Sequence, residues 1–206
     1  MLFDCDGVLI DSETLANRAL QKSLADVDMA WTLPDIARTF TGHSWQTCLA
    51  MIEERLGQPV PNDFQPNNRD YFINLMDEEL VVMEGIDRVL DTLSLPFAVV
   101  TNSQSEELSH KMKVTGLGRY FPESHRFNAE TLGVSKPDPA IYRKAADALG
   151  LDIRQCLVIE DSLPGLTAAS KAGAEVWAYQ PHVEEEALDR LAVKRTFHHW
   201  SEFPRL

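Results

Sequence analysis

The stretch that decides the fold reads Met1-Leu2-Phe3-Asp4-Cys5-Asp6-Gly7-Val8-Leu9-Ile10-Asp11-Ser12. A short apolar run is followed by two carboxylates one residue apart. Alternate positions of an extended chain point to the same side, so Asp4 and Asp6 face the same way. Gly7 has no Cβ and lets the backbone turn sharply. Neighbouring carboxylates repel, so both stay ionised only beside a cation or many hydrogen-bond donors. Alone, the pattern is typical of an acidic turn; a cation site needs support from the rest of the chain.

The composition is that of an ordinary globular protein. The 206 residues are 44% hydrophobic and 25% charged, enough for one large domain or one domain with an insert. The net charge of −13 disfavours nucleic acids and anionic membrane surfaces as partners. A phosphate site in so acidic a chain would need a metal ion to offset the charge.

The cysteines and the hydropathy pattern bear on the cellular setting. The three cysteines are far apart and odd in number, which predicts free thiols in a reducing, cytoplasmic setting. No C-x-x-C spacing points to a metal site. No apolar run of ~18 residues predicts a transmembrane helix, and no basic-then-apolar leader precedes Asp4. We therefore expect a cytoplasmic protein, monomeric by default, that binds neither membranes nor nucleic acid.

The segment 14–80 is predicted to be entirely helical. Leu15, Ala19, Leu20 and Leu24 recur at helical spacing, and Ser12 before them is a good N-cap. Further helices are predicted at 33–40, 44–56 and 62–80. Trp45 is expected to pack in the core of this helical segment. No strand signal interrupts the segment, so it is expected to be an insert of 14–80.

From residue 81 onward strands alternate with helices. Strands are predicted at 97–101, 125–128, 156–160, 176–179 and 196–197. Helices are predicted at 86–93, 104–114, 140–149, 163–172 and 184–191. Ser103 and Glu106 are expected to form a capping box. This alternation predicts an α/β fold, a Rossmann-like three-layer parallel sheet formed by residues 1–13 and 81–206.

Polar residues follow the predicted strands where each one ends. They are Asp4 and Asp6, Thr101-Asn102-Ser103, and Glu160-Asp161-Ser162, with Lys136 in a proline-rich loop between. Parallel strands open their carboxyl ends on one edge, where ligands bind. Carboxylate oxygens suit a hard divalent cation, and a lysine, a hydroxyl and helix N-termini suit a phosphoryl group.

The four motifs, in this order and spacing, resemble the haloacid dehalogenase-like (HAD) superfamily of phosphohydrolases. The helical insert after the first motif resembles the branch that contains β-phosphoglucomutase and 6-phosphogluconate phosphatase. The resemblance implies the HAD fold with a helical cap at 14–80. Dehalogenases, phosphonate-cleaving members and cation pumps lack an acid at the position of Asp6, so phosphate-ester chemistry is favoured.

The resemblance also implies a role for each motif residue. Asp4 is the expected nucleophile, which forms an aspartyl-phosphate. Asp6 is the expected general acid and then general base. Mg²⁺ would be held by Asp4, the main-chain carbonyl of Asp6, and Asp161, with Glu160 binding directly or through a water.

The phosphoryl and substrate contacts are implied in the same way. Thr101 would hydrogen-bond a phosphoryl oxygen, supported by the backbone of Asn102, and Lys136 would offset the charge of the phosphoryl group and of the nucleophile. Gly42 and His43 lie where the cap of related proteins meets the substrate. The expected partner is a small phosphorylated metabolite, a sugar phosphate or a sugar-acid phosphate such as 6-phosphogluconate.

Three functions remain open at this point. The first is a Mg²⁺-dependent phosphatase. The second is a phosphosugar mutase, whose cap carries a lysine and an arginine where this chain has Thr41 and Trp45. The third is an inactive binding module with the same fold. The filled motifs favour an enzyme, and the missing basic pair favours a phosphatase over a mutase.

Overall fold

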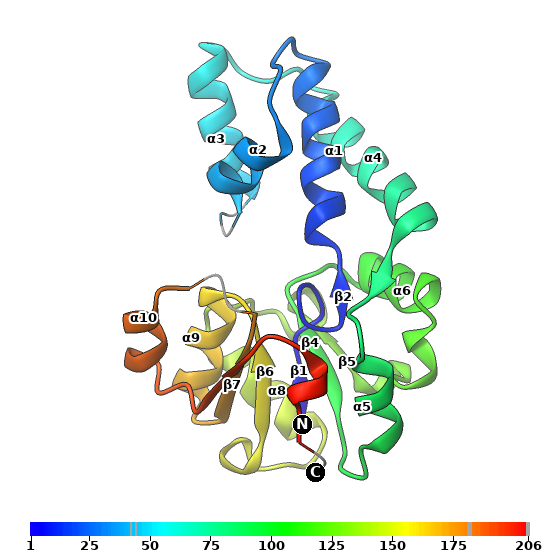
Figure 1. The fold of residues 1–206 in the computed structure, drawn as a ribbon, viewed down its shortest axis with the longest axis vertical. Coiled ribbons are helices and arrows are strands. Elements are labelled where there is room, and N and C mark those ends of the chain that lie inside the picture. The colour runs from blue at the N-terminus through cyan, green and yellow to red at the C-terminus, as the bar shows by residue number, and fades with distance from the viewer. Residues whose placement is uncertain (42, 44, 181–182, 205–206) are drawn as a thin grey trace. The chain divides into compact units, whose positions relative to one another are not determined.

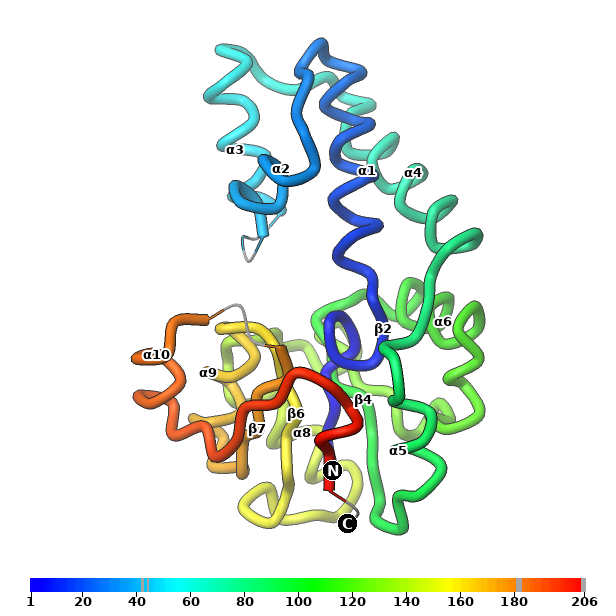
Figure 2. Tube along the Cα trace, viewed as in Figure 1, coloured from blue at the N-terminus to red at the C-terminus, as the bar shows by residue number. Residues whose placement is uncertain are grey.

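A computed structural model of the chain describes residues 1–41, 43, 45–180 and 183–204. These residues form two compact units. An α/β unit contains Met1–Asp11 and Val81–Leu206, and a helical unit contains Ser12–Leu80. Figure 2 follows the chain as it leaves the α/β unit after Asp11 and returns to it at Val81.

The α/β unit is built on a six-stranded sheet with the order β5-β4-β1-β6-β7-β8. Every neighbouring pair in this sheet is parallel, which confirms the predicted fold class (Figure 1). The strands are β1 (Leu2–Phe3), β4 (Ala98–Thr101), β5 (Arg126–Asn128), β6 (Leu157–Glu160), β7 (Glu175–Tyr179) and β8 (Arg195–Phe197). The first strand lies between β4 and β6, so its end is flanked by the ends of both neighbours.

Six helices belong to this unit in the described residues. They are α5 (Ile86–Thr92), α6 (Ser105–Val114), α7 (Ala129–Leu132), α8 (Ala140–Ala148), α9 (Leu163–Ala172) and α10 (Glu185–Arg190). Short 3-10 turns occupy Leu117–Arg119, Glu123–His125, Ile153–Gln155 and Trp200–Glu202. Helix α8 packs Tyr142, Ala145 and Ala146, and α9 packs Ala168 and Ala169, in one core with Leu2, Val100 and Val158 of the sheet, and all of these residues are fully buried. This dry layer holds the central strands in register.

Aromatic side chains pack around Phe3. Its ring meets those of Phe97, Phe121 and Trp200 at centroid distances of 6.1 to 6.3 Å. The indole of Trp200 also donates a hydrogen bond of 3.2 Å to the carbonyl of Val8. The C-terminal segment thereby fixes the loop that follows Asp6.

A two-stranded ribbon was not predicted from the sequence. Strand β2 (Ile10–Asp11) pairs antiparallel with β3 (Val81–Val82). The amide of Met83 extends the pairing to the carbonyl of Leu9, 2.9 Å away. Strands of two residues are too short to show a periodic pattern, and their pairing depends on residues distant in the sequence.

The helical unit contains α1 (Glu13–Ala25), α2 (Leu33–Phe40), α3 (Trp45–Leu56) and α4 (Phe64–Glu79). Its core is formed by Leu20, Leu24, Ile36, Phe40, Cys48, Ile52 and Phe64. The ring of Trp45 stacks on Phe64 at 6.5 Å, which confirms its predicted place in this core. Arg18 of α1 makes a bidentate ion pair with Glu79 of α4, with N–O distances of 2.5 and 2.8 Å.

Two local details complete the fold. The predicted capping box of Ser103 and Glu106 is wrong, because the N-cap of α6 is Gln104 and makes no side-chain cap bond. The hydroxyl of Ser103 lies instead 3.1 Å from the carboxylate of Asp6. Among the helices of the described residues, none combines the length and apolar character needed to cross a bilayer.

Candidate active site

Strand β1 delivers Asp4 to the carboxyl edge of the sheet. The amide of Asp4 donates to the carbonyl of Ile159 on β6 at 3.0 Å, so its backbone is still held by the neighbouring strand. Gly7 then turns the chain with a φ of 78°. A Cβ on Gly7 would lie 2.2 Å from Oδ2 of Asp161. Only glycine allows both this backbone angle and this close approach.

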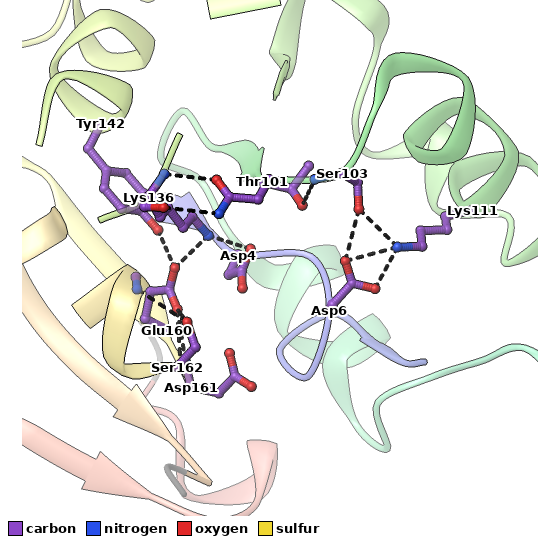
Figure 3. Close-up of polar contacts among 12 residues, drawn as sticks. Asp4, Asp6, Thr101, Ser103, Lys111, Lys136, Tyr142, Glu160, Asp161 and Ser162 are labelled. Atoms are coloured by element: carbon purple, nitrogen blue, oxygen red, sulfur yellow. Dashed lines mark hydrogen bonds and ion pairs between the residues drawn. The ribbon is translucent and has the colours of Figure 1, made fainter. Parts of the chain in front are cut away.

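Lys136 lies between two carboxylates at the centre of the site. Its Nζ is 2.5 Å from Oδ1 of Asp4 and 2.5 Å from Oε1 of Glu160 (Figure 3). All three side chains are buried. Asn102 fixes the backbone of Lys136, accepting from its amide at 2.8 Å and donating to its carbonyl at 3.3 Å. The amide side chain of Asn102 is therefore committed to this loop.

Glu160 is fully buried at the end of β6. Its Oε1 also accepts from the hydroxyl of Tyr142 at 2.6 Å, and its Oε2 accepts from Asp161 and Ser162 at 3.1 to 3.3 Å. A Cβ at Gly165 would lie within 2.1 Å of three atoms of this carboxyl group. Tyr142 was missed from the sequence because it reads as an ordinary core position of an amphipathic helix.

Three acids form a candidate cation site. Carboxylate oxygens of Asp4, Glu160 and Asp161 lie within 4.8 Å of one another. Oδ1 of Asp161 is buried and finds no hydrogen-bond partner among the described residues. A buried carboxylate oxygen without a donor is costly, and a hard divalent cation ligated by oxygen would satisfy it. The donor set therefore fits Mg²⁺.

A second ion-pair cluster surrounds Asp6. Nζ of Lys111 lies 2.7 and 2.9 Å from the two oxygens of Asp6 and 3.0 Å from the hydroxyl of Ser103. It also pairs with Glu107, one turn earlier on α6. Figure 3 shows that this cluster is separate from that of Lys136. Lys111 was missed from the sequence, although its four-residue spacing from Glu107 places both on one face of α6.

Burial and like charge dominate the electrostatics of the acids. Burial, with the nearby Glu160, raises the pKa of Asp4 to about 7. Burial and the charge of Asp4 raise the pKa of Asp161 well above its usual range. Burial opposes the charge of Lys136, but Asp4 and Glu160 outweigh it and raise the pKa of the lysine. A cation in the site would favour ionised Asp4 and Asp161.

We expect the metal-free protein to lose stability as the pH rises from about 4 to about 7. The pKa of Asp4 moves from 3.8 to about 7 on folding, so the folded state keeps a proton that the unfolded chain releases. This contribution is complete below the unfolded pKa and is lost as the pH passes the folded one. Urea unfolding in EDTA at about pH 5 and about pH 8 measures it.

Asp4→Asn is the control for this titration. The variant should lose less stability than the wild type between the two pH values, because the contribution of Asp4 is then absent. A wild-type protein whose pH dependence equals that of Asp4→Asn would contradict the raised pKa of Asp4.

Most of the predicted site residues come together. Asp4, Asp6, Thr101, Asn102 and Lys136 line a pocket of about 350 Å³, with Ser103, Ser162 and Pro164. Glu160 and Asp161 adjoin it through the carboxylate cluster. His43 is exposed on the helical unit, and its proposed contact with substrate stays a prediction. The predicted contact of Gly42 lies outside the described residues.

This edge of the sheet has the features of a phosphohydrolase. A buried aspartate paired with a lysine stands beside two further carboxylates, in a pocket with a hydroxyl and amides. The chain belongs to the haloacid dehalogenase-like hydrolase family, whose match spans residues 1–173. The predicted resemblance is thereby confirmed, and the chain is an enzyme of the phosphatase class.

Three relatives illustrate the similarity. The chain is 27% identical to 6-phosphogluconate phosphatase of Escherichia coli K12, over 100% of this chain and 93% of the relative. It is 27% identical to phosphoglycolate phosphatase of Aquifex aeolicus, over 87% and 85% of the two chains. A HAD family hydrolase of Deinococcus radiodurans, solved with bound phosphate and sodium, is 33% identical, with a TM-score of 0.83 over 98% of this chain and 91% of that one.

Proposed function

We propose that this chain is a Mg²⁺-dependent phosphatase that hydrolyses a sugar phosphate or sugar-acid phosphate through an aspartyl-phosphate. One observation carries the proposal: buried Asp4 is paired with Lys136 beside the unpartnered oxygen of Asp161. The names of the two curated relatives denote phosphorylated acids as substrates. They support a small substrate of the same kind.

In the first step an oxygen of Asp4 attacks phosphorus and forms a P–O bond. The bond from phosphorus to the ester oxygen breaks, and Asp6 gives its proton to the departing oxygen. In the second step Asp6 takes a proton from water, whose oxygen attacks the same phosphorus. The bond from phosphorus to Asp4 then breaks, which releases phosphate and restores both aspartates.

Lys136 and Thr101 position the phosphoryl group. The ammonium of Lys136 already touches Asp4, so it offsets charge on both the nucleophile and the phosphoryl oxygens. The hydroxyl oxygen of Thr101 accepts from the amide of Ser103 at 3.1 Å. Its proton therefore points away from that amide and can be donated to a phosphoryl oxygen. The main-chain amide of Asn102, in the segment that leads into α6, would add a further donor.

Asp4, Asp161, Glu160 and the main-chain carbonyl of Asp6 would hold Mg²⁺. Bound there, the ion supplies positive charge that counters the charge of the phosphoryl group. Both oxygens of Glu160 already accept hydrogen bonds, so this residue would share its oxygens with those donors. Its further task is to hold Lys136 and the Asp161 segment in place.

The helical unit is proposed to act as a cap on the catalytic core. Residues 14–80 would supply the substrate contacts, with Gly42 and His43 among them, and 1–13 with 81–206 would supply the chemistry. Position 41 favours hydrolysis over a mutase, since Thr41 replaces the mutase lysine and its hydroxyl donates to Glu13 at 2.9 Å. A neutral side chain at this position cannot form an ion pair with a second phosphate group.

We expect EDTA to abolish hydrolysis of p-nitrophenyl phosphate and Mg²⁺ to restore it. Without the ion, burial and mutual repulsion favour the protonated forms of Asp4 and Asp161, and a protonated Asp4 is a poor nucleophile. Added Mg²⁺ should also raise the melting temperature, because a ligand that binds only the folded state stabilises it. Asp161→Asn should weaken this shift. Full activity in EDTA would overturn the metal dependence.

A substrate screen tests the proposed class. Sugar phosphates, sugar-acid phosphates and nucleotides are compared by phosphate release with Mg²⁺. We expect the highest kcat/KM for a sugar phosphate or sugar-acid phosphate. Glucose 1-phosphate with a bisphosphate primer tests for mutase activity, which would show as isomerisation without phosphate release. Preference for nucleotides would overturn the substrate class and leave the phosphatase chemistry intact.

A further inference from the structure

The buried lysine Lys111 has no role in the chemistry described so far. Its side chain is 2% exposed, whereas those of its partners Asp6 and Glu107 are 35% and 36% exposed. The ammonium therefore lies beneath the rim of the pocket with carboxylates above it. Burying a lysine charge is costly, and here two carboxylates and the hydroxyl of Ser103 receive its donors.

The two acids of the first motif are held by two different lysines. Lys136 pairs with Asp4, and Lys111 contacts both oxygens of Asp6. The hydroxyl of Ser103 lies 3.1 Å from Asp6 and 3.2 Å from Glu107, and its single proton serves one or the other. Figure 3 shows the carboxylate of Asp6 turned toward Lys111 and Ser103. The side chain of Asp6 thus has a defined direction.

We propose that Lys111 is the positioning residue for Asp6, which it aims at the leaving oxygen of the substrate with the help of Ser103. This inference rests on the proposed function, in which Asp6 transfers the protons. Asp6 lies just before the turn at Gly7, and its own side chain would rotate without an anchor. Asp6 and Ser103 line the pocket with Asp4 and Lys136, and Lys111 acts on the substrate only through Asp6. Holding a proton donor in a reactive direction lowers the barrier to the transfer.

The leaving group separates this role from a purely structural one. An alkoxide needs a proton as it departs, whereas p-nitrophenolate leaves without one. The value of kcat/KM reports on steps up to phosphoryl transfer to Asp4. Loss of the anchor of Asp6 should therefore lower kcat/KM for an alkyl phosphate and leave that for p-nitrophenyl phosphate nearly unchanged.

The experiment compares Lys111→Met with the wild type on p-nitrophenyl phosphate and on the best alkyl phosphate of the substrate screen. We expect kcat/KM for the alkyl ester to fall roughly 100-fold, the lower end of what general acid–base catalysis contributes. Lys113→Met is the matched control, since this exposed lysine of the same helix makes the same change in charge. An equal loss on both esters, no loss, or a gain would overturn the proposal.

Two further variants keep the outcome interpretable. If circular dichroism shows that Lys111→Met does not fold, Ser103→Ala removes the second anchor of Asp6 instead. This variant should also lower kcat/KM for the alkyl ester and not for p-nitrophenyl phosphate, by a smaller factor. Asp6→Asn should itself lower kcat/KM for the alkyl ester and not for p-nitrophenyl phosphate. Lys111→Met should cause no further loss in the Asp6→Asn background. If Asp6→Asn shows no selectivity, the proposed function fails. If it does and Lys111→Met does not, only the role of Lys111 fails.

Discussion

Asp4→Asn is expected to lower the turnover of p-nitrophenyl phosphate by about 10⁴- to 10⁶-fold, the range seen when one member of a covalent-catalysis set is removed. Asparagine keeps the shape of the side chain but has no carboxylate to attack phosphorus. Lys136 keeps its contact with Glu160, so the variant should still fold. Acid-quenched wild-type enzyme should carry a phosphoryl group on the peptide that contains Asp4, and the variant should carry none.

Asp147→Asn is the control for this change. Asp147 is exposed on α8 in the same unit, and its replacement removes the same charge away from the pocket. Its turnover should equal that of the wild type. An Asp4→Asn protein with undiminished turnover and native circular dichroism would exclude Asp4 as nucleophile. A phosphoryl group on another residue would show which side chain replaces it.

Most of the fold could be predicted because its elements are long or strongly patterned. Helices at 33–40 and 163–172 were predicted with the bounds that the structure shows. The buried strands ending at Thr101 and Glu160 were also recognised, since continuous apolar runs are typical of parallel sheets. The ribbon of β2 and β3 was missed, because it consists of two short segments far apart in the sequence.

The carboxyl edge of the sheet could be predicted for the same reason. Three of the four motifs follow β1, β4 and β6, which are neighbours in the sheet, and the motif of Lys136 lies in the loop between α7 and α8. The carboxyl ends of parallel strands open on one edge, which brings the strand-end motifs together. What the sequence could not show is the partner of each charge. Lys136 was expected to act on phosphate, and the structure adds that it bridges Asp4 and Glu160. Such pairing depends on side-chain distances that no pattern contains.

Residues that support the site were the hardest to find. Tyr142 and Lys111 lie on helices, where one reads as core and the other as a solvated lysine. Both are buried against carboxylates of the site. The spacing of Glu107 and Lys111 was available as a signal, but four-residue intervals of polar residues are common on exposed helices. Only the three-dimensional contact with Asp6 distinguishes this face.

Lys136→Met is expected to damage both stability and activity. It leaves the buried carboxylates of Asp4 and Glu160 without their common ammonium, and breaking a buried ion pair from one side costs about 3–5 kcal/mol. Urea unfolding of the metal-free proteins near neutral pH measures this loss. In the presence of Mg²⁺, kcat should fall by about 10²- to 10³-fold, as when one donor to a developing charge is removed.

The coupling between Lys136 and Asp4 gives the sharper test. In the Asp4→Asn background, Lys136→Met should lower the free energy of unfolding by less than in the wild type, because only one carboxylate then loses its ammonium partner. Residues in contact couple by about 0.5–3 kcal/mol. Lys171→Met, an exposed lysine on α9, is the control and should change neither stability nor kcat. Additive losses from Lys136→Met and Asp4→Asn would contradict the pair, since a lysine that stabilises the fold through other contacts would cost the same in both backgrounds. A stable Lys136→Met protein with reduced kcat would leave the phosphoryl role standing and remove the role in the fold.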